Sequence, residues 1–156
     1  MLYTESEEAF LGQGHDDAMT EPFSDWRSMR LRKHADYQRV YKGSRKHTSQ
    51  SMSYFFRFRS AEEPVENAGP RVGLTAGRVL GKAVERNRIK RRMREAVRLH
   101  LSELPAGVDV VLHPRRSVLE LEFARLEREV SRIFSAVMQT AARTVAASQA
   151  QAGARP

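Results

Sequence analysis

Apolar residues recur at helical spacing where the basic part of the chain begins. Tyr37, Val40 and Tyr41 occupy positions i, i+3 and i+4, and Gly43 follows as a residue that commonly ends a helix. This spacing predicts a short amphipathic helix over residues 34–42.

Two later segments have the pattern of strands. Residues 51–59 are rich in aromatic residues and alternate at a period of two. One face of this strand carries Met52, Tyr54, Phe56 and Phe58. Residues 71–76 resume the strand pattern after a polar stretch that contains two prolines and a glycine. We expect the two strands to pair as an antiparallel hairpin.

The last third of the chain predicts a buried strand followed by a long helix. Residues 108–113 are mostly apolar and are bounded by a proline. Large apolar residues then recur every three or four positions from Leu119 to Val137, which predicts a helix that ends near Arg143. Residues 143–156 are rich in alanine, glutamine and serine and lack an apolar face, so we expect a flexible tail.

Between these segments, residues 81–98 predict a helix with two opposed faces, which continues to about Leu101. Its apolar face carries Ile89, Met93, Ala96 and Val97. The rest is cationic, with eight basic residues against two acidic ones: Lys82, Arg86, Arg88, Lys90, Arg91, Arg92, Arg94 and Arg98 against Glu85 and Glu95. Arginine binds phosphate oxygens bidentately, whereas a merely solvated helix interleaves glutamate with lysine. We therefore interpret this surface as a binding face for a polyanion.

The order helix, strand, strand, helix, strand, helix predicts an α+β sandwich in which helices pack on one small sheet. A length of 156 residues suits one domain with tails. The chain has no run of about 20 apolar residues that could span a membrane, and its start lacks the pattern of a secretory signal. With no cysteine and five scattered histidines, which we expect to be incidental, it is predicted to be cytoplasmic and free of disulfides.

Charge is distributed unevenly along the chain. The formal net charge is +8, but residues 1–26 contain seven acidic residues and no lysine or arginine. The other 130 residues hold 27 basic against 12 acidic residues, a net of +15. We interpret residues 1–28 as an acidic disordered extension: a bare tail, a start placed before Met29, or a polyanion mimic that covers the basic surface. Residues 29–142 form the working domain.

Aromatic residues and further cations accompany the arginine-rich helix. The aromatic residues are Tyr37, Tyr41, Tyr54 and Phe56, and the cations near the first strand are Arg45, Lys46, Arg57 and Arg59. A basic groove floored by aromatic rings is the general form of a site for single-stranded nucleic acid, where a stacked base contributes about 1 to 3 kcal/mol. Phe56 and Phe58 suit the core better, since an alternating strand buries one face, whereas the tyrosine hydroxyls suit a wet cleft.

In their order and spacing these residues resemble the protein subunit of bacterial ribonuclease P. That family has the signature Gly-x-Ala-Val-x-Arg-Asn-Arg-x-Lys-Arg-x-x-Arg-Glu. The residues that reproduce it are Gly81, Ala83, Val84, Arg86, Asn87, Arg88, Lys90, Arg91, Arg94 and Glu95. The similarity continues through RLRKHADYQRVYKG, RVGLT and DVVLHPR, from about Arg30 to Val137. A lone arginine-rich helix is a weak indication, but this collinear set is a specific one.

The resemblance implies a function in the 5′ maturation of tRNA. In the family, a catalytic RNA subunit removes the 5′ leader of precursor tRNA with Mg²⁺ held mainly by RNA, and the protein binds both RNAs without performing the chemistry. No catalytic residue, protein-bound metal, membrane or further protein partner is implied. The implied RNA-binding residues are Lys82, Arg86, Asn87, Arg88, Lys90, Arg91, Arg94 and Arg98. The implied leader cleft consists of Tyr37, Tyr41, Tyr54, Arg57 and Thr75.

The resemblance also implies an αβββαβα-type sandwich with a mixed sheet and a left-handed crossover through the arginine-rich helix, against the usual right-handed rule. The sequence departs from the family where Ser-Lys-Lys usually precedes the signature, because Gly77, Arg78 and Val79 stand there. One positive charge is thereby absent at Val79. Asn87 has two interpretations, a bond to an RNA hydroxyl or base edge and a cap on its own helix.

Three other functions stay open on the residues alone. A ribosomal or other structural RNA-binding protein would share the charge but would not need the aromatic cleft. A metal-dependent nuclease acting unaided would need converging carboxylates, whereas Glu85 and Glu95 lie roughly three helical turns apart. A DNA-binding module would need a recognition helix and usually a dimer. We rank these below the ribonuclease P interpretation.

Overall fold

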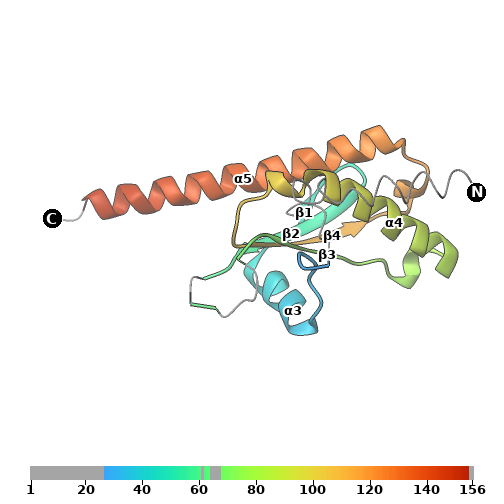
Figure 1. The fold of residues 1–156 in the computed structure, drawn as a ribbon, viewed down its shortest axis with the longest axis horizontal. Coiled ribbons are helices and arrows are strands. Elements are labelled where there is room, and N and C mark those ends of the chain that lie inside the picture. The colour runs from blue at the N-terminus through green and yellow to red at the C-terminus, as the bar shows by residue number, and fades with distance from the viewer. Residues whose placement is uncertain (1–26, 61, 64–67, 155–156) are drawn as a thin grey trace, which may run out of the picture.

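A four-stranded sheet separates two layers of helices in the computed structural model of this protein (Figure 1). The structure describes residues 27–60, 62–63 and 68–154. The helices are α3 (His34–Gly43), α4 (Ala83–His100) and α5 (Phe123–Ala154). The strands are β1 (His47–Thr48), β2 (Met52–Phe58), β3 (Arg71–Leu74) and β4 (Val108–Pro114), with short 3-10 helices at Arg78–Leu80, Leu101–Glu103 and Arg116–Leu119. The predicted α+β class and αβββαβα order are confirmed; the handedness of the crossover stays a prediction.

The sheet has the strand order β1-β2-β4-β3. Strand β4 pairs antiparallel with β2, placing Val110 opposite Phe56, and parallel with β3, placing Val110 beside Val72. The predicted hairpin between β2 and β3 is therefore wrong. β4 lies between β2 and β3 because its apolar run is buried along almost its whole length. Each of its two edges therefore needs a hydrogen-bonded neighbour.

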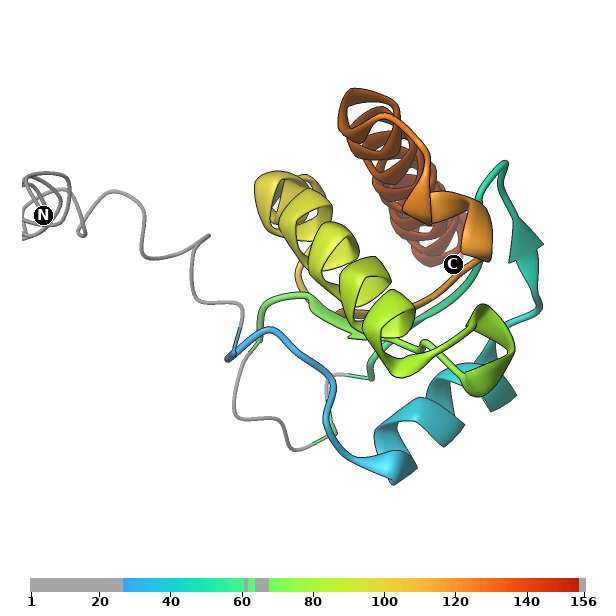
Figure 2. The ribbon, with the colours of Figure 1, turned by 90° about the vertical axis from the view of Figure 1, so that its right-hand side faces the viewer.

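The main core lies between the sheet and the pair α4 and α5, and a smaller core lies under α3 on the other face (Figure 2). The predicted apolar face of α4 is confirmed, because Ile89, Met93, Ala96 and Val97 are all buried. On α5 the buried residues are Leu126, Val130, Ile133, Phe134 and Val137. The smaller core consists of Leu31, Val40 and Val111, with half-buried Tyr37, Tyr41 and Phe55 packed against it. One face of the sheet is thus covered by two helices and the other by one.

Helix α5 continues to Ala154, past the predicted end near Arg143, while Leu119 belongs to the preceding 3-10 helix. The predicted tail is largely helical, since alanine and glutamine have high helix propensity and extend a helix that a core has already nucleated. This part of α5 projects beyond the sheet (Figure 1). Its flexibility stays a prediction. Most of the predicted acidic extension, residues 1–26, lies outside the described residues.

A buried carboxylate joins the strands at one end of the sheet. Asp109 is 1% exposed and accepts hydrogen bonds from Arg59 and, through both oxygens, from Arg71 at 2.9 and 2.8 Å. Arg71 also lies 3.5 Å from the carboxylate of Asp36, which belongs to α3. This network connects β2, β3, β4 and α3, so it fixes the position of α3 under the sheet.

Candidate nucleic-acid interface

The start of α4 is held by an ion pair between Glu85 and Arg116. The guanidinium of Arg116 contacts both carboxylate oxygens of Glu85, at 2.6 and 3.1 Å, and donates to the Leu80 carbonyl at 2.7 Å. Glu85 also accepts the backbone N–H of Lys82 at 3.0 Å. The bonds from Arg116, and then the Lys82 N–H, lower the pKa of Glu85 from 4.5 to about 2. Gly81 has a φ of 125° beside this pair, a conformation that favours glycine.

Most cations of α4 have no acidic partner in the part of the chain that the structure describes. Those without an ion pair there are Arg86, Arg88, Lys90, Arg91 and Arg94. By contrast, Arg98 pairs with Glu95 at 2.6 Å, and Arg92 donates to the carbonyl of Leu121. Five like charges close together on one helix repel one another, and an anionic partner relieves this repulsion. The cationic face of α4 is therefore suited to bind an anion.

Asn87 and two valines lie among these cations. Asn87 is exposed in the second turn of α4, which begins at Ala83, so its amide does not cap the helix start. The RNA-contact interpretation of Asn87 stays a prediction, and Lys82 is likewise exposed just before the helix. Val79 and Val84 are 92% and 79% exposed on either side of the Gly81 loop. Apolar side chains exposed within a cationic face are suited to a partner that covers them.

Tyr37 and Tyr41 lie on the inner side of α3, against the smaller core. The Tyr37 hydroxyl is 3.4 Å from the Leu31 carbonyl, and its ring covers Gly73, where any side chain would clash. The Tyr41 hydroxyl bonds Nε2 of His113 at 2.8 Å, and its ring meets Phe55 edge-on. Burial raises the pKa of both tyrosines, so the hydroxyls stay protonated donors. These rings have well-defined structural partners.

Tyr54 lies on the opposite face of the sheet from Tyr37 and Tyr41. It pairs with Leu112 and packs against the main core, because alternate residues of β2 point to opposite faces. Its ring stacks on His47 at a centroid distance of 5.0 Å. The structure therefore does not bring the three tyrosines into one cleft. The sequence could not show this, because the face of the sheet on which α3 packs is not encoded in the spacing between α3 and β2. Burial and the nearby Arg45 lower the pKa of His47, so its stacked ring is neutral at pH 7.

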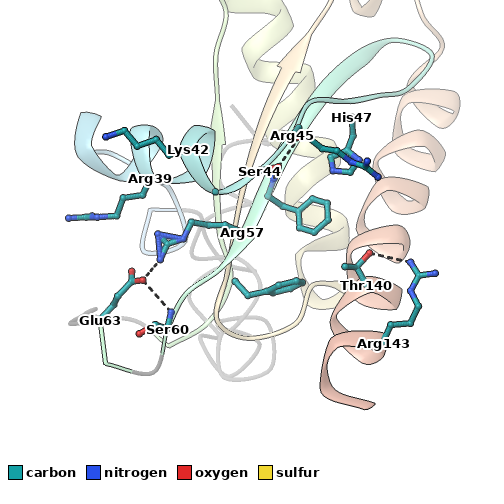
Figure 3. Close-up of a pocket in the computed structure, with 13 residues that line it drawn as sticks. Arg39, Lys42, Ser44, Arg45, His47, Arg57, Ser60, Glu63, Thr140 and Arg143 are labelled. Carbon is teal, nitrogen blue, oxygen red and sulfur yellow. Dashed lines mark hydrogen bonds and ion pairs between the residues drawn. The ribbon is translucent and has the colours of Figure 1, made fainter. Parts of the chain in front are cut away.

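A basic groove of about 850 Å³ runs between the end of α3, the edge of β2 and α5 (Figure 3). Its cations come from all three elements: Arg39, Lys42, Arg45, Arg57 and Arg143. Phe56, Phe58 and His47 supply its aromatic surface. Phe56 and Phe58 also pack against the main core, so each has the predicted core role together with a groove-lining one. Glu63 is the acidic residue of the groove and pairs with Arg57.

The backbone of β2 contributes to this groove because β1 is short. Strand β1 pairs only with Ser53 and Tyr54, and the N–H of Phe56 donates instead to the Ser44 hydroxyl at 3.1 Å. An edge of this kind leaves backbone groups available to a ligand. A short strand next to aromatic residues and arginines was the sequence feature that could have identified the groove.

The other residues of the predicted cleft lie elsewhere. Of the predicted set only Arg57 lines the groove. Thr75 is half-buried just after β3, where its N–H donates to the Leu112 carbonyl at 3.1 Å. Arg59, a candidate cation, is instead bound to the buried Asp109. His47 and His113, which the sequence suggested were incidental, both contact aromatic rings.

The described residues contain no cluster of three or more histidine, aspartate or glutamate side chains that could hold a metal ion. No helix among them is long and apolar enough to cross a membrane.

Known proteins resemble this chain over most of its length. The family model described as "Ribonuclease P" matches residues 26–138. The ribonuclease P protein component of Finegoldia magna is 38% identical over 101 residues, 65% of this chain and 83% of that protein. That of Chloroflexus aggregans is 38% identical over 108 residues, 69% and 76% of the two chains.

Solved structures give the same result. The RNase P protein of Thermotoga maritima superposes with a TM-score of 0.56 at 26% identity, covering 67% of this chain and 94% of that one. A mutant of the Staphylococcus aureus RNase P protein has a TM-score of 0.58 at 25% identity, covering 74% and 89%.

Proposed function

Because this chain belongs to the ribonuclease P protein family and is the protein subunit that partners the ribonuclease P RNA, we propose that the exposed cations of α4 bind that RNA. The observation that carries the proposal is the run of arginine and lysine side chains on α4 without acidic partners among the described residues. Phosphate groups neutralise such a face and release counterions, which favours association. The protein thereby contributes to the tRNA processing of the ribonucleoprotein.

In this proposal the RNA subunit carries the cleavage chemistry and holds most of the Mg²⁺, and the protein needs no further protein partner. The two carboxylates on the exposed part of α4 support this division of labour. Glu85 is bound by Arg116 and Glu95 by Arg98, so both already have structural partners. The protein residues bind and orient RNA, which lowers the Mg²⁺ concentration at which the complex is active.

We further propose that the groove holds the 5′ leader of precursor tRNA. The ring of His47, which stacks on Phe56 at a centroid distance of 5.1 Å, offers an aromatic surface to a base, and Arg45 and Arg143 supply cations for its phosphate backbone. Stacking and phosphate contacts tolerate any base, as a leader of variable sequence requires. The groove replaces the cleft that the three tyrosines predicted.

The test is cleavage of a 5′-extended precursor tRNA at low Mg²⁺ by a bacterial ribonuclease P RNA, with and without this protein. We expect the protein to increase the cleavage rate although the protein alone cleaves nothing. Tight RNA binding without any increase would instead indicate a structural RNA-binding protein and overturn the proposal. Cleavage by the protein alone would overturn the assignment of the chemistry to RNA.

A further inference from the structure

A second cluster of arginines lies on α5, beside the turn between β1 and β2. Arg125, Arg128 and Arg132 recur at three and four residues, so they lie along one side of the helix. Together with Gln50, Leu121 and Glu129 they line a pocket of about 180 Å³. This arginine pocket is separate from the groove that holds Arg143 and lies outside α4.

The three arginines of the arginine pocket outnumber its one carboxylate, Glu129. Arg128 and Arg132 are exposed, and neither forms an ion pair or a hydrogen bond with a described residue. Arg125 lies 3.9 Å from Glu122, with both side chains mostly exposed, which makes a weak pair. Three guanidinium groups around one concavity repel one another unless an anion lies between them.

Glu129, the acidic residue of the pocket, accepts hydrogen bonds from the turn between β1 and β2. It is 2% exposed, and its Oε2 accepts the Ser49 hydroxyl at 2.6 Å and the Ser51 N–H at 2.7 Å. On the other side of the same turn, Arg115 donates to the carbonyls of Ser49 and Gln50, both at 3.1 Å. These bonds fix the turn against α5, so the wall of the pocket is already formed without a ligand.

The pocket also adjoins the arginine-rich helix. Leu121, which lines the pocket, accepts a hydrogen bond from Arg92 of α4 through its carbonyl. An RNA that covers α4 therefore comes close to the arginine pocket.

We propose that the arginine pocket binds a phosphate group of RNA, as a contact additional to α4 and the groove. Arginine presents planar pairs of N–H donors that match phosphate oxygens, and Gln50 adds a neutral amide at the rim. The pocket suits one phosphate group rather than a base, because it is small and no aromatic side chain lines it. This inference rests on the proposed function, which supplies RNA as the partner.

The test measures the affinity of the full-length protein for ribonuclease P RNA over a series of salt concentrations. Arg128→Ala with Arg132→Ala should lower the slope of log affinity against log salt by about 0.7 to 0.9, the value for one phosphate group that is no longer neutralised. Each single substitution should lower the slope by clearly less than the double substitution, since the remaining arginine still neutralises the shared phosphate. Arg128→Lys with Arg132→Lys should keep most of the slope but weaken binding, because lysine retains the charge and lacks the planar donor pair.

The matched control is Arg27→Ala with Arg32→Ala, which removes two exposed arginines that do not line the pocket. A slope unchanged in the Arg128 and Arg132 variants, or lowered equally in the control, would overturn the inference. Repeating the titration with precursor tRNA and the assembled complex shows whether the phosphate belongs to the RNA subunit or the substrate. The cleavage rate with the wild-type protein is measured in parallel. If the wild-type protein increases this rate while the slopes of the Arg128 and Arg132 variants are unchanged, only this inference fails and the proposed function stands.

Discussion

Glu85 and Arg116 connect the first turn of the arginine-rich helix to the 3-10 helix that follows β4. Arg116 contacts the Glu85 carboxylate and the Leu80 carbonyl, so one guanidinium holds both sides of the Gly81 turn. Neither residue offers a charge to RNA while the pair is intact. Their function is to position the cations that begin at half-buried Arg86.

The depressed pKa of Glu85 predicts an acid-sensitive contribution to stability. Because its pKa falls from 4.5 to about 2 on folding, the pair contributes fully above pH 4.5 and is lost as the pH falls towards 2. Glu85→Gln should therefore be less stable than wild type at pH 6, and this difference should shrink with acidification. Urea unfolding at several pH values, with exposed Glu62→Gln as the control, measures this difference. A difference that persists at pH 2 would contradict the assignment.

Asp109 should be among the residues whose loss most affects stability. Asp109→Asn removes the buried carboxylate that pairs with both Arg59 and Arg71, and breaking such a buried pair typically costs about 3 to 5 kcal/mol. Chemical unfolding measures this loss. Glu122→Gln, at an exposed ion pair of 3.9 Å, should change stability by less than about 1 kcal/mol. Similar losses in both variants would show that the buried network has no special role.

Among the elements, α4 combines a buried apolar face with an open cationic one. Replacing Arg86, Arg91 and Arg94 with alanine should leave the core contacts of Ile89 and Met93 in place. The log-salt slope for binding ribonuclease P RNA should fall by about 0.7 to 0.9 for each phosphate group that the variant no longer neutralises. Arg98→Ala should have a smaller effect, since Glu95 already neutralises Arg98. An unchanged slope in the triple variant would remove α4 from the interface.

The groove between α3, β2 and α5 predicts a dependence on leader length. Arg45→Ala with Arg143→Ala should raise KM on the order of tenfold for substrates with a long 5′ leader, because two cations no longer bind its phosphates. Substrates with a one-nucleotide leader serve as the control and should change little. An equal effect on both would place these arginines elsewhere on the substrate. Tyr37→Ala with Tyr41→Ala should mainly reduce stability, since both rings pack under α3.

At the scale of the whole molecule, charge is divided between an acidic start and a basic domain. Removing residues 1–26 changes the formal net charge from +8 to +15. The association rate with ribonuclease P RNA should then rise several-fold at low salt, because long-range attraction steers the encounter. Stopped-flow measurements at low and high salt test this. A rate increase that persists at high salt would point to a specific contact of the extension rather than its charge.

Local patterns and long-range packing contributed differently to this structure. The apolar face of α4 and the alternation of β2 follow from helical and strand periods, so the sequence predicts them directly. The sequence does not predict which strand pairs with β2, because β3 and β4 both have strand patterns. Only packing decides that β4 lies between β2 and β3. The end of α5 was missed for a different reason: none of the described side chains after Val137 is buried, yet the helix already nucleated by Phe134 continues through alanine-rich residues.

The sequence by itself determined most of the elements, the cationic face of α4 and the family, because these depend on residue types at short and fixed spacings. Only the tertiary structure decided which side chains share a surface. It placed Tyr54 on the face of the sheet opposite Tyr37 and Tyr41, and it brought Arg45 to the same groove as Arg143. Such neighbours depend on strand order and on the position of α5, which are set by packing between segments far apart in the chain.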